Sequence, residues 1–235
     1  MIKKAMNIEE QLGIIQEAYD GTVEDYLNGI KDEDILPEKF MKSSEYKKFI
    51  KAEHLCNSGE IEIKAFLDSQ KGMNFLDVGS CANLIGYGLY KWDSTYYGVD
   101  ISNELLKVTK KFTGENKIEI GGLYAAEASD LPFDNEFFDI AAIIGVLEYY
   151  DIEYIEKVLM ELHRVIKSGG KIVVDFPNLN HPDVNTMIEL ENYLGRPRFN
   201  LPCIEEFENA LDLHFQTVEI DRKNLMIRYN CISKK

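Results

Sequence analysis

Hydrophobic residues follow two different rhythms along this chain, and the change falls near residue 73. Before that point they recur at the spacing of helical turns, as with Leu12, Ile15 and Tyr26, which could share one face of a helix. From Met73 onward, short apolar runs alternate with longer amphipathic stretches, which is typical of βαβ units and a parallel sheet. We therefore expect a helical N-terminal cap or lid over residues 1–72 and an α/β domain over residues 73–235.

The clearest strand-like runs are short and rich in Val, Ile, Phe and Tyr. They cover residues 73–78, 95–100, 137–145 and 170–176. An amphipathic helix over 154–168 separates the last two, and Gly169 and Gly170 are expected to end it. Residues 215–233 predict two strands turned at 222–224, so at least one strand runs antiparallel. The expected fold class is α/β, with a doubly wound, mostly parallel sheet and an antiparallel C-terminal hairpin.

The charge balance restricts the class of partner. With 41 acidic and 26 basic side chains, the chain has a formal net charge of −15. Such a surface repels a polyanion, so we expect a small-molecule partner and no nucleic acid. No apolar run is long enough to span a bilayer and the first residues lack a signal segment, which predicts a cytoplasmic protein without membrane contact. The four cysteines are scattered without metal-ligand spacing, which favours reduced thiols and no metal site.

Acidic residues and glycines follow the predicted strands at their carboxyl ends. Asp77 and Gly79 close the first strand, Asp100 the second and Gly145 the fourth. Ligands of open α/β sheets bind at that edge, close to the point where the strand order reverses. Asp100 lies about 20 residues after the glycine turn, the separation at which such folds place an acid for ribose hydroxyls. Because Ser102 is an equally good cap for the following helix, Asp100 is left for a ligand.

Four segments carry a resemblance to a known family. They are FLDVGSCANLIG, YYGVDIS, AEASDLPFDNEFFDIAAIIGVLEYYD and LHRVIKSGGKIVVDFPN. In this order and spacing, over roughly residues 73–178, they resemble class I S-adenosylmethionine-dependent methyltransferases. The closest likeness is to the branch that methylates small molecules and quinone precursors, as in ubiquinone and menaquinone biosynthesis. The resemblance implies a seven-stranded Rossmann-like sheet, S-adenosyl-L-methionine as cofactor, and methyl transfer to an oxygen or nitrogen of a small acceptor.

The resemblance also implies which residues bind the cofactor: Asp77, Gly79, Ser80, Cys81, Asp100, Ile101, Glu127, Ala128 and Gly145. The first four would lie at its methionine end. Asp100 would accept from the ribose hydroxyls while Ile101 packs on the adenine. Glu127 would accept from the adenine amino group, where the family usually has Asp, and Ala128 would offer its backbone N–H to the ring. The carbonyl of Gly145 would face the ammonium group.

The glycine turn departs from the family pattern, because Cys81 and Asn83 stand where glycines are expected. Asn tolerates left-handed backbone angles better than most residues, and S-adenosylmethionine has no pyrophosphate that demands the closest backbone approach. We therefore expect the turn to bind the cofactor still. The alternative is a non-catalytic binding or interaction module with a degenerate methyltransferase fold. A nicotinamide dehydrogenase is disfavoured, because GSCANLIG does not supply G-x-G-x-x-G.

Methyl transfer from a sulfonium needs in-line positioning and, for some acceptors, removal of a proton. The candidates for that second task are His181 and Tyr149. A solvated loop histidine and the apolar start of a helix are equally good interpretations of these two residues. Residues 178–202 predict an irregular cover on the acceptor side. Three tyrosines of the N-terminal helices are candidates for a lid over the cofactor: Tyr19, Tyr26 and Tyr46.

Overall fold

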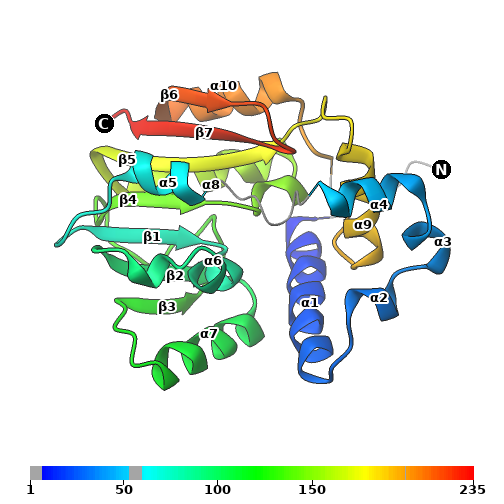
Figure 1. Ribbon diagram of the computed structural model, residues 1–235. Coiled ribbons are helices and arrows are strands. Elements are labelled where there is room, and N and C mark those ends of the chain that lie inside the picture. The colour runs from blue at the N-terminus through cyan, green and yellow to red at the C-terminus, as the bar shows by residue number, and fades with distance from the viewer. Residues whose placement is uncertain (1–6, 53–59, 199) are drawn as a thin grey trace.

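The computed structural model describes residues 7–52, 60–198 and 200–235, and these residues form one seven-stranded sheet. Its strand order is β3-β2-β1-β4-β5-β7-β6 (Figure 1). The first five strands in that order are parallel, whereas β7 is antiparallel to both β5 and β6. The strands are β1 (Asn74–Val78), β2 (Thr95–Asp100), β3 (Gly122–Ala125), β4 (Phe138–Ile143), β5 (Ile166–Pro177), β6 (Phe215–Asp221) and β7 (Met226–Ser233). The expected fold class is therefore confirmed.

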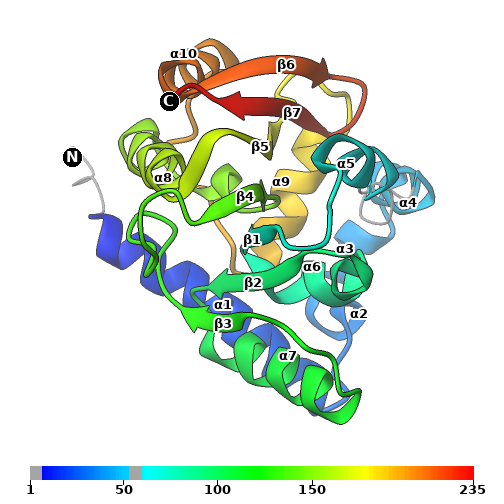
Figure 2. The same cartoon turned by 90° about the vertical axis from the view of Figure 1, so that its left-hand side faces the viewer.

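Helices cover both faces of the sheet, because alternate residues of a strand point to opposite sides. Leu76 and Val78 of β1 belong to the core under α8 and α10, whereas Phe75 belongs to the core under α5 and α6. Figure 2 shows these two pairs of helices on opposite sides of the sheet. The helices of the α/β part are α5 (Glu60–Leu67), α6 (Ser80–Gly86), η1 (Leu89–Lys91), α7 (Asn103–Glu115), η2 (Leu147–Tyr149), α8 (Ile152–Val165), α9 (Val184–Tyr193) and α10 (Ile204–His214).

The end of α8 differs from the sequence expectation. The helix stops at Val165, not at the glycine pair, and the chain is already extended at Ile166. Ile166 is fully buried and pairs with Phe138 of β4, after which the register shifts before regular pairing resumes. Lys235 donates to the Ile166 carbonyl, which satisfies a backbone acceptor near the helix end. Helix α8 thus ends earlier than the local sequence predicts, at the point where Ile166 becomes buried and its carbonyl accepts a tertiary hydrogen bond. Gly169 lies within β5.

The N-terminal helices gather at the carboxyl ends of the parallel strands (Figure 1). They are α1 (Ile8–Leu27), α2 (Asp32–Ile35), α3 (Glu38–Met41) and α4 (Ser44–Lys51). Phe40 and Phe49 share a small core with Met187 of α9, so the segment before the sheet packs against the segment after β5. Tyr26 is 77% exposed and lies outside the buried stripe of α1, although the helical spacing placed it there. Tyr46 packs on the ring of Phe40 with 4.8 Å between centroids.

No helix in the described ranges has both the length and the apolar character needed to cross a membrane.

Candidate active site

A cavity of about 260 Å³ opens at the carboxyl ends of β1, β2 and β4. β1 lies between β2 and β4 in the sheet, so the cavity lies at the point where the strand order reverses. Six of the nine residues predicted to bind a cofactor line it: Gly79, Asp100, Ile101, Glu127, Ala128 and Gly145. Asp77 and Ser80 are fully buried beside it, and Cys81 belongs to α6. The structure thus brings six of the nine residues together in the wall of one cavity.

Gly79 forms the tight turn between β1 and α6. Its φ of 77° lies in the left-handed region, and its N–H donates to the carbonyl of Val99 at 2.8 Å. A Cβ at this position would lie only 2.3 Å from Cγ2 of Val146. Both the backbone angle and the available space therefore require glycine, which lets the chain turn tightly along the cavity wall.

Asn83 replaces one of the expected glycines and supports the turn through its side chain. Its Nδ2 donates to Oδ1 of Asp77 and to the carbonyl of Gly79, each at 3.3 Å. It lies inside α6, so the left-handed angle invoked from the sequence is not needed. Tyr96 donates its hydroxyl to Oδ2 of Asp77 at 2.7 Å. Burial raises the pKa of Asp77 to about 7, against the lowering effect of these two hydrogen bonds.

Asp100 ends β2 with its side chain at the cavity wall, 8% exposed. Its Oδ1 accepts from the backbone N–H of Ser102 at 2.8 Å. Ser102, and not Asp100, caps α7 by accepting from the N–H of Leu105. The Ser102 hydroxyl donates in turn to Asp20 of α1, which also accepts from the N–H of Glu104 at 3.2 Å. α1 is thereby fixed to the start of α7, next to the acid predicted to bind ribose.

Glu127 and Ala128 follow β3 and line the same end of the cavity. Glu127 is exposed and accepts from the Ser129 hydroxyl at 3.4 Å, whereas Ala128 is buried. A turn closed by the N–H of Asp130 donating to the Glu127 carbonyl positions both residues. The acid and the backbone N–H predicted for adenine recognition are therefore neighbours at the cavity wall.

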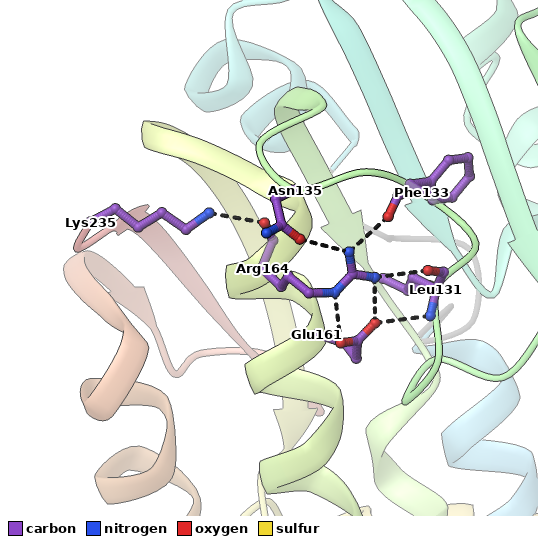
Figure 3. A network of polar contacts seen from close by, with 6 residues as sticks. All are labelled: Leu131, Phe133, Asn135, Glu161, Arg164 and Lys235. Atoms are coloured by element: carbon purple, nitrogen blue, oxygen red, sulfur yellow. Dashed lines mark hydrogen bonds and ion pairs between the residues drawn. The ribbon is translucent and has the colours of Figure 1, made fainter.

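Arg164 of α8 fixes the loop that continues from this turn (Figure 3). Its guanidinium donates to the carbonyls of Leu131 and Phe133 and to Oδ1 of Asn135, at 2.7 to 3.0 Å. It also pairs with Glu161 at 2.7 Å, and Glu161 accepts from the N–H of Leu131. This network explains physically why DLPFDNEFFD and HRVIKSGG occur together, since the arginine of one segment holds the backbone of the other.

The other end of the cavity is lined by tyrosines and carboxylates from distant parts of the chain. The hydroxyls of Tyr19 and Tyr149 lie 3.0 Å apart, and Tyr149 donates to Glu191 of α9 at 3.1 Å. Arg196 lies over the ring of Tyr19, 4.3 Å from its centroid, and 3.6 Å from Glu191. Glu148 lines this end too and is 8% exposed. Helix α1 and the segment after β5 both contribute to the wall.

Burial controls the electrostatics of this end. It raises the pKa of Glu148 to about 7, against the opposing charge of Arg198. It also raises the pKa of Asp175 well above its usual value, an effect that the charge of Glu148 increases. Asp175 accepts from the N–H of Gly145 at 2.9 Å and so fixes the residue that ends the β4 region. The pKa of Tyr149 is raised as well, again mainly by burial, so its hydroxyl stays neutral near pH 7.

The two candidate catalytic residues occupy different places. Tyr149 lines the cavity, whereas His181 is not part of the lining, and its Nδ1 accepts from the N–H of Asp183 at 3.2 Å. Sequence reasoning missed Glu148 and Glu191. Glu148 directly follows the β4 region in GVLEYY, which was a usable signal, but nothing local indicates that Glu191 reaches Tyr149 across 42 residues. Within the described residues, no group of His, Cys, Asp or Glu side chains is arranged to hold a metal ion.

The sequence profile of a family described as "Methyltransferase domain" matches residues 76–174, the part that contains the end of β1, all of β2 and β4, and most of the cavity wall. This part of the chain is similar to the class I S-adenosylmethionine-dependent methyltransferases. It is 27% identical over 187 residues to the sterol 4-C-methyltransferase strm-1 of Caenorhabditis elegans, covering 76% of this chain and 54% of that protein. It is 31% identical over 96 residues to the human mitochondrial 2-methoxy-6-polyprenyl-1,4-benzoquinol methylase, covering 40% of this chain and 29% of that protein.

The chain thus spans about half the length of the sterol enzyme and under a third of the benzoquinol methylase. Its fold is also that of the Burkholderia thailandensis 1,6-didemethyltoxoflavin-N1-methyltransferase. The TM-score is 0.64 at 12% identity, and the match covers 100% of this chain and 94% of the other.

The cavity suits S-adenosylmethionine, the methyl donor that the resemblance implies. A ribose diol needs an acceptor of two hydrogen bonds, and Asp100 lies at the end of the strand where such an acid is expected. An adenine amino group needs a further acceptor, and Glu127 is exposed at the same wall. The glycine cradle leaves no room for a Cβ at Gly79. The donor set and the cradle both fit S-adenosylmethionine.

Proposed function

We propose that this chain transfers a methyl group from S-adenosylmethionine to an oxygen or nitrogen atom of a small molecule. The observation that carries the proposal is the two-ended cavity. Asp100 and Glu127 line one end, in the places where the resemblance implies nucleoside recognition, and tyrosines with the buried Glu148 line the other. A single cavity that combines a nucleoside end with a polar second end suits a reaction between two bound molecules.

When bound, S-adenosylmethionine supplies a methyl group on a positively charged sulfur that is its own leaving group. The chain's task is to hold both molecules in line and to accept a proton where the acceptor loses one. Asp100 would accept from the ribose hydroxyls and Glu127 from the adenine amino group. The carbonyl of Gly145 would face the ammonium. Asp175 supports that last position by accepting from the Gly145 N–H at 2.9 Å.

The choice of acceptor atom needs its own argument, because one relative is named as a carbon methyltransferase. Oxygen or nitrogen is favoured by the polar groups at the second end of the cavity. These are the hydroxyls of Tyr19 and Tyr149 and the carboxylates of Glu148 and Glu191. Carboxylates and neutral hydroxyls pair with N–H and O–H groups, whereas an apolar carbon acceptor gains nothing from them.

We also propose that two segments cover the acceptor. Residues 1–72 supply Tyr19 from α1, and residues 178–202 supply Glu191 from α9, and both side chains line the cavity. The net charge of −15 supports a small-molecule partner over a nucleic acid. A cytoplasmic location and the division of the chain at residue 72 stay predictions.

Isothermal titration calorimetry with S-adenosylmethionine and S-adenosylhomocysteine, followed by an acceptor screen, tests the function. The screen offers phenols, amines and carboxylic acids with a methyl-labelled donor, and mass spectrometry detects the labelled products. We expect binding of both nucleosides and methylation of at least one phenol or amine. Binding of neither nucleoside would refute the proposal and favour the non-catalytic module, and products methylated only on carbon would refute the choice of acceptor atom.

A further inference from the structure

Glu148 is a buried carboxylate in the cavity wall, and the function proposed above gives it no specific role. It follows the β4 region in the short helix η2, lines the cavity and is 8% exposed. Its Oε2 is fully buried and makes no hydrogen bond with any described residue. A buried carboxylate oxygen without a donor is costly for a fold, so its retention at a cavity wall points to a donor supplied by a ligand.

The position of Glu148 relates it to the reaction. Its Oε1 lies 3.8 Å from where a Cβ on Gly145 would stand, so the carboxylate is next to the backbone that ends the β4 region. The hydroxyl pair of Tyr19 and Tyr149 occupies the same end of the cavity. The carboxylate is therefore close to the sheet edge predicted to hold the donor and lines the cavity together with the two tyrosines.

We propose that Glu148 is the catalytic base that accepts the proton of the acceptor's N–H or O–H group. This inference depends on the function proposed above. The acceptor's lone pair forms the new bond to the methyl carbon. The bond from that carbon to sulfur breaks with its electron pair left on sulfur. The proton of the acceptor passes to the Glu148 carboxylate, which later loses it to solvent.

Other titratable groups at this end are less suited to the task. The pKa of Tyr149 is raised by burial, so its hydroxyl does not ionise near neutrality. Glu191 accepts from Tyr149 and lies 3.6 Å from Arg196. Several charged and titratable groups interact electrostatically with Glu148. They come from α1, from η2 and the residue after it, from β5, and from α9 and the segment after α9: Tyr19, Tyr149, Tyr150, Asp175, Glu191 and Arg198. Burial, which dominates, raises the pKa of Glu148 to about 7, a value suited to a base at neutral pH.

The experiment compares wild type with Glu148→Gln and with the control Glu153→Gln, an exposed residue five positions further along the chain. Turnover is measured on the phenol or amine found in the acceptor screen, and S-adenosylhomocysteine affinity by calorimetry. For Glu148→Gln we expect a fall in kcat of about 10²- to 10⁴-fold, with cofactor affinity unchanged. Wild-type kcat should rise with pH to about 7 and then level, and this rise should be absent in the variant.

A variant rate close to wild type would overturn the inference. So would an intact rate with much weaker S-adenosylhomocysteine binding, since Glu148 would then serve the cofactor's ammonium. Binding of phenol and anisole to the S-adenosylhomocysteine complex gives a readout that needs no turnover. We expect phenol to bind about tenfold tighter, an advantage lost in Glu148→Leu, because a charge-assisted O–H contact is worth roughly that much. Equal binding of the two probes, or binding of neither, contradicts the inference, whereas failure of S-adenosylhomocysteine to bind contradicts the proposed function itself.

Discussion

Replacing Gly79 by alanine perturbs the turn between β1 and α6 in two separable ways. The φ of 77° costs an L-residue roughly 1–2 kcal/mol. The added Cβ would lie 2.3 Å from Cγ2 of Val146, and relief of such overpacking typically costs a further 1–3 kcal/mol. We therefore expect Gly79→Ala to lower the free energy of unfolding by about 2–5 kcal/mol. Urea denaturation followed by circular dichroism measures this change.

A double-mutant cycle with Val146→Ala separates the two costs, because this change removes the clashing methyl. The double variant should recover the steric part and keep the loss of about 1–2 kcal/mol from the backbone angle. Gly13→Ala is the matched control, since Gly13 lies within α1 with open space around its Cβ position, and it should gain roughly 0.5–1 kcal/mol. A Gly79→Ala variant as stable as wild type, or a cycle without coupling, would refute the reasoning.

Two further predictions concern Asp77 and Arg164. Because folding raises the pKa of Asp77 from 3.8 to about 7, the folded state binds the proton more tightly than the unfolded chain. The wild type therefore loses stability as the pH rises from about 4 to about 7, by up to roughly 4 kcal/mol from this group, and Asp77→Asn should lack that loss in pH-dependent urea denaturation. Arg164→Met removes the donors to Leu131 and Phe133 and should lower the free energy of unfolding by about 2–3 kcal/mol, measured in the same way.

Each of these variants has its own control. The difference in stability between Asp77→Asn and wild type should vary with pH, and a constant difference would show that Asp77 titrates normally in the folded chain. For Arg164, the comparison is Lys107→Met, which breaks an ion pair with Glu104 at the surface and should change the stability much less. Equal effects of the two substitutions would mean that the network of Figure 3 contributes no more than an ordinary surface ion pair.

The sheet could be predicted from the sequence because its information is local. The four strands predicted individually before the hairpin are strong apolar runs, and all four appear within a few residues of their expected bounds. The end of α8 was misplaced because the local glycine signal competes with burial of Ile166 and with the hydrogen bond from Lys235 at the far end of the chain. Tyr26 was misplaced because helical spacing gives the direction of an apolar stripe but not its width.

In the candidate site, too, some residues could be predicted from local sequence and others depend on contacts between distant segments. Gly79 and Asp100 follow strands, and the rule that ligands bind at strand ends is enough to bring them together. Glu148 was overlooked because a glutamate at the start of a helical stretch is ordinarily exposed, and its burial depends on α1 and α9 covering it. Glu191 joins the cavity only through its contact with Tyr149 across 42 residues, which no local pattern encodes. The part of the cavity wall that contains Gly79 and Asp100 was therefore predictable, whereas the contributions of Glu148 and Glu191 needed the tertiary structure.

Calorimetric titration of S-adenosylhomocysteine into wild type and Asp100→Asn tests the nucleoside site most directly. Asn can still accept from the N–H of Ser102, as Oδ1 of Asp100 does at 2.8 Å, but it offers an N–H group where the ribose hydroxyls need an acceptor. Loss of a hydrogen bond to a charged group predicts a Kd raised by about 10- to 100-fold, with the exposed Asp93→Asn unchanged. A wild type that binds and an Asp100→Asn variant that binds equally well would contradict the placement of the cofactor in this cavity.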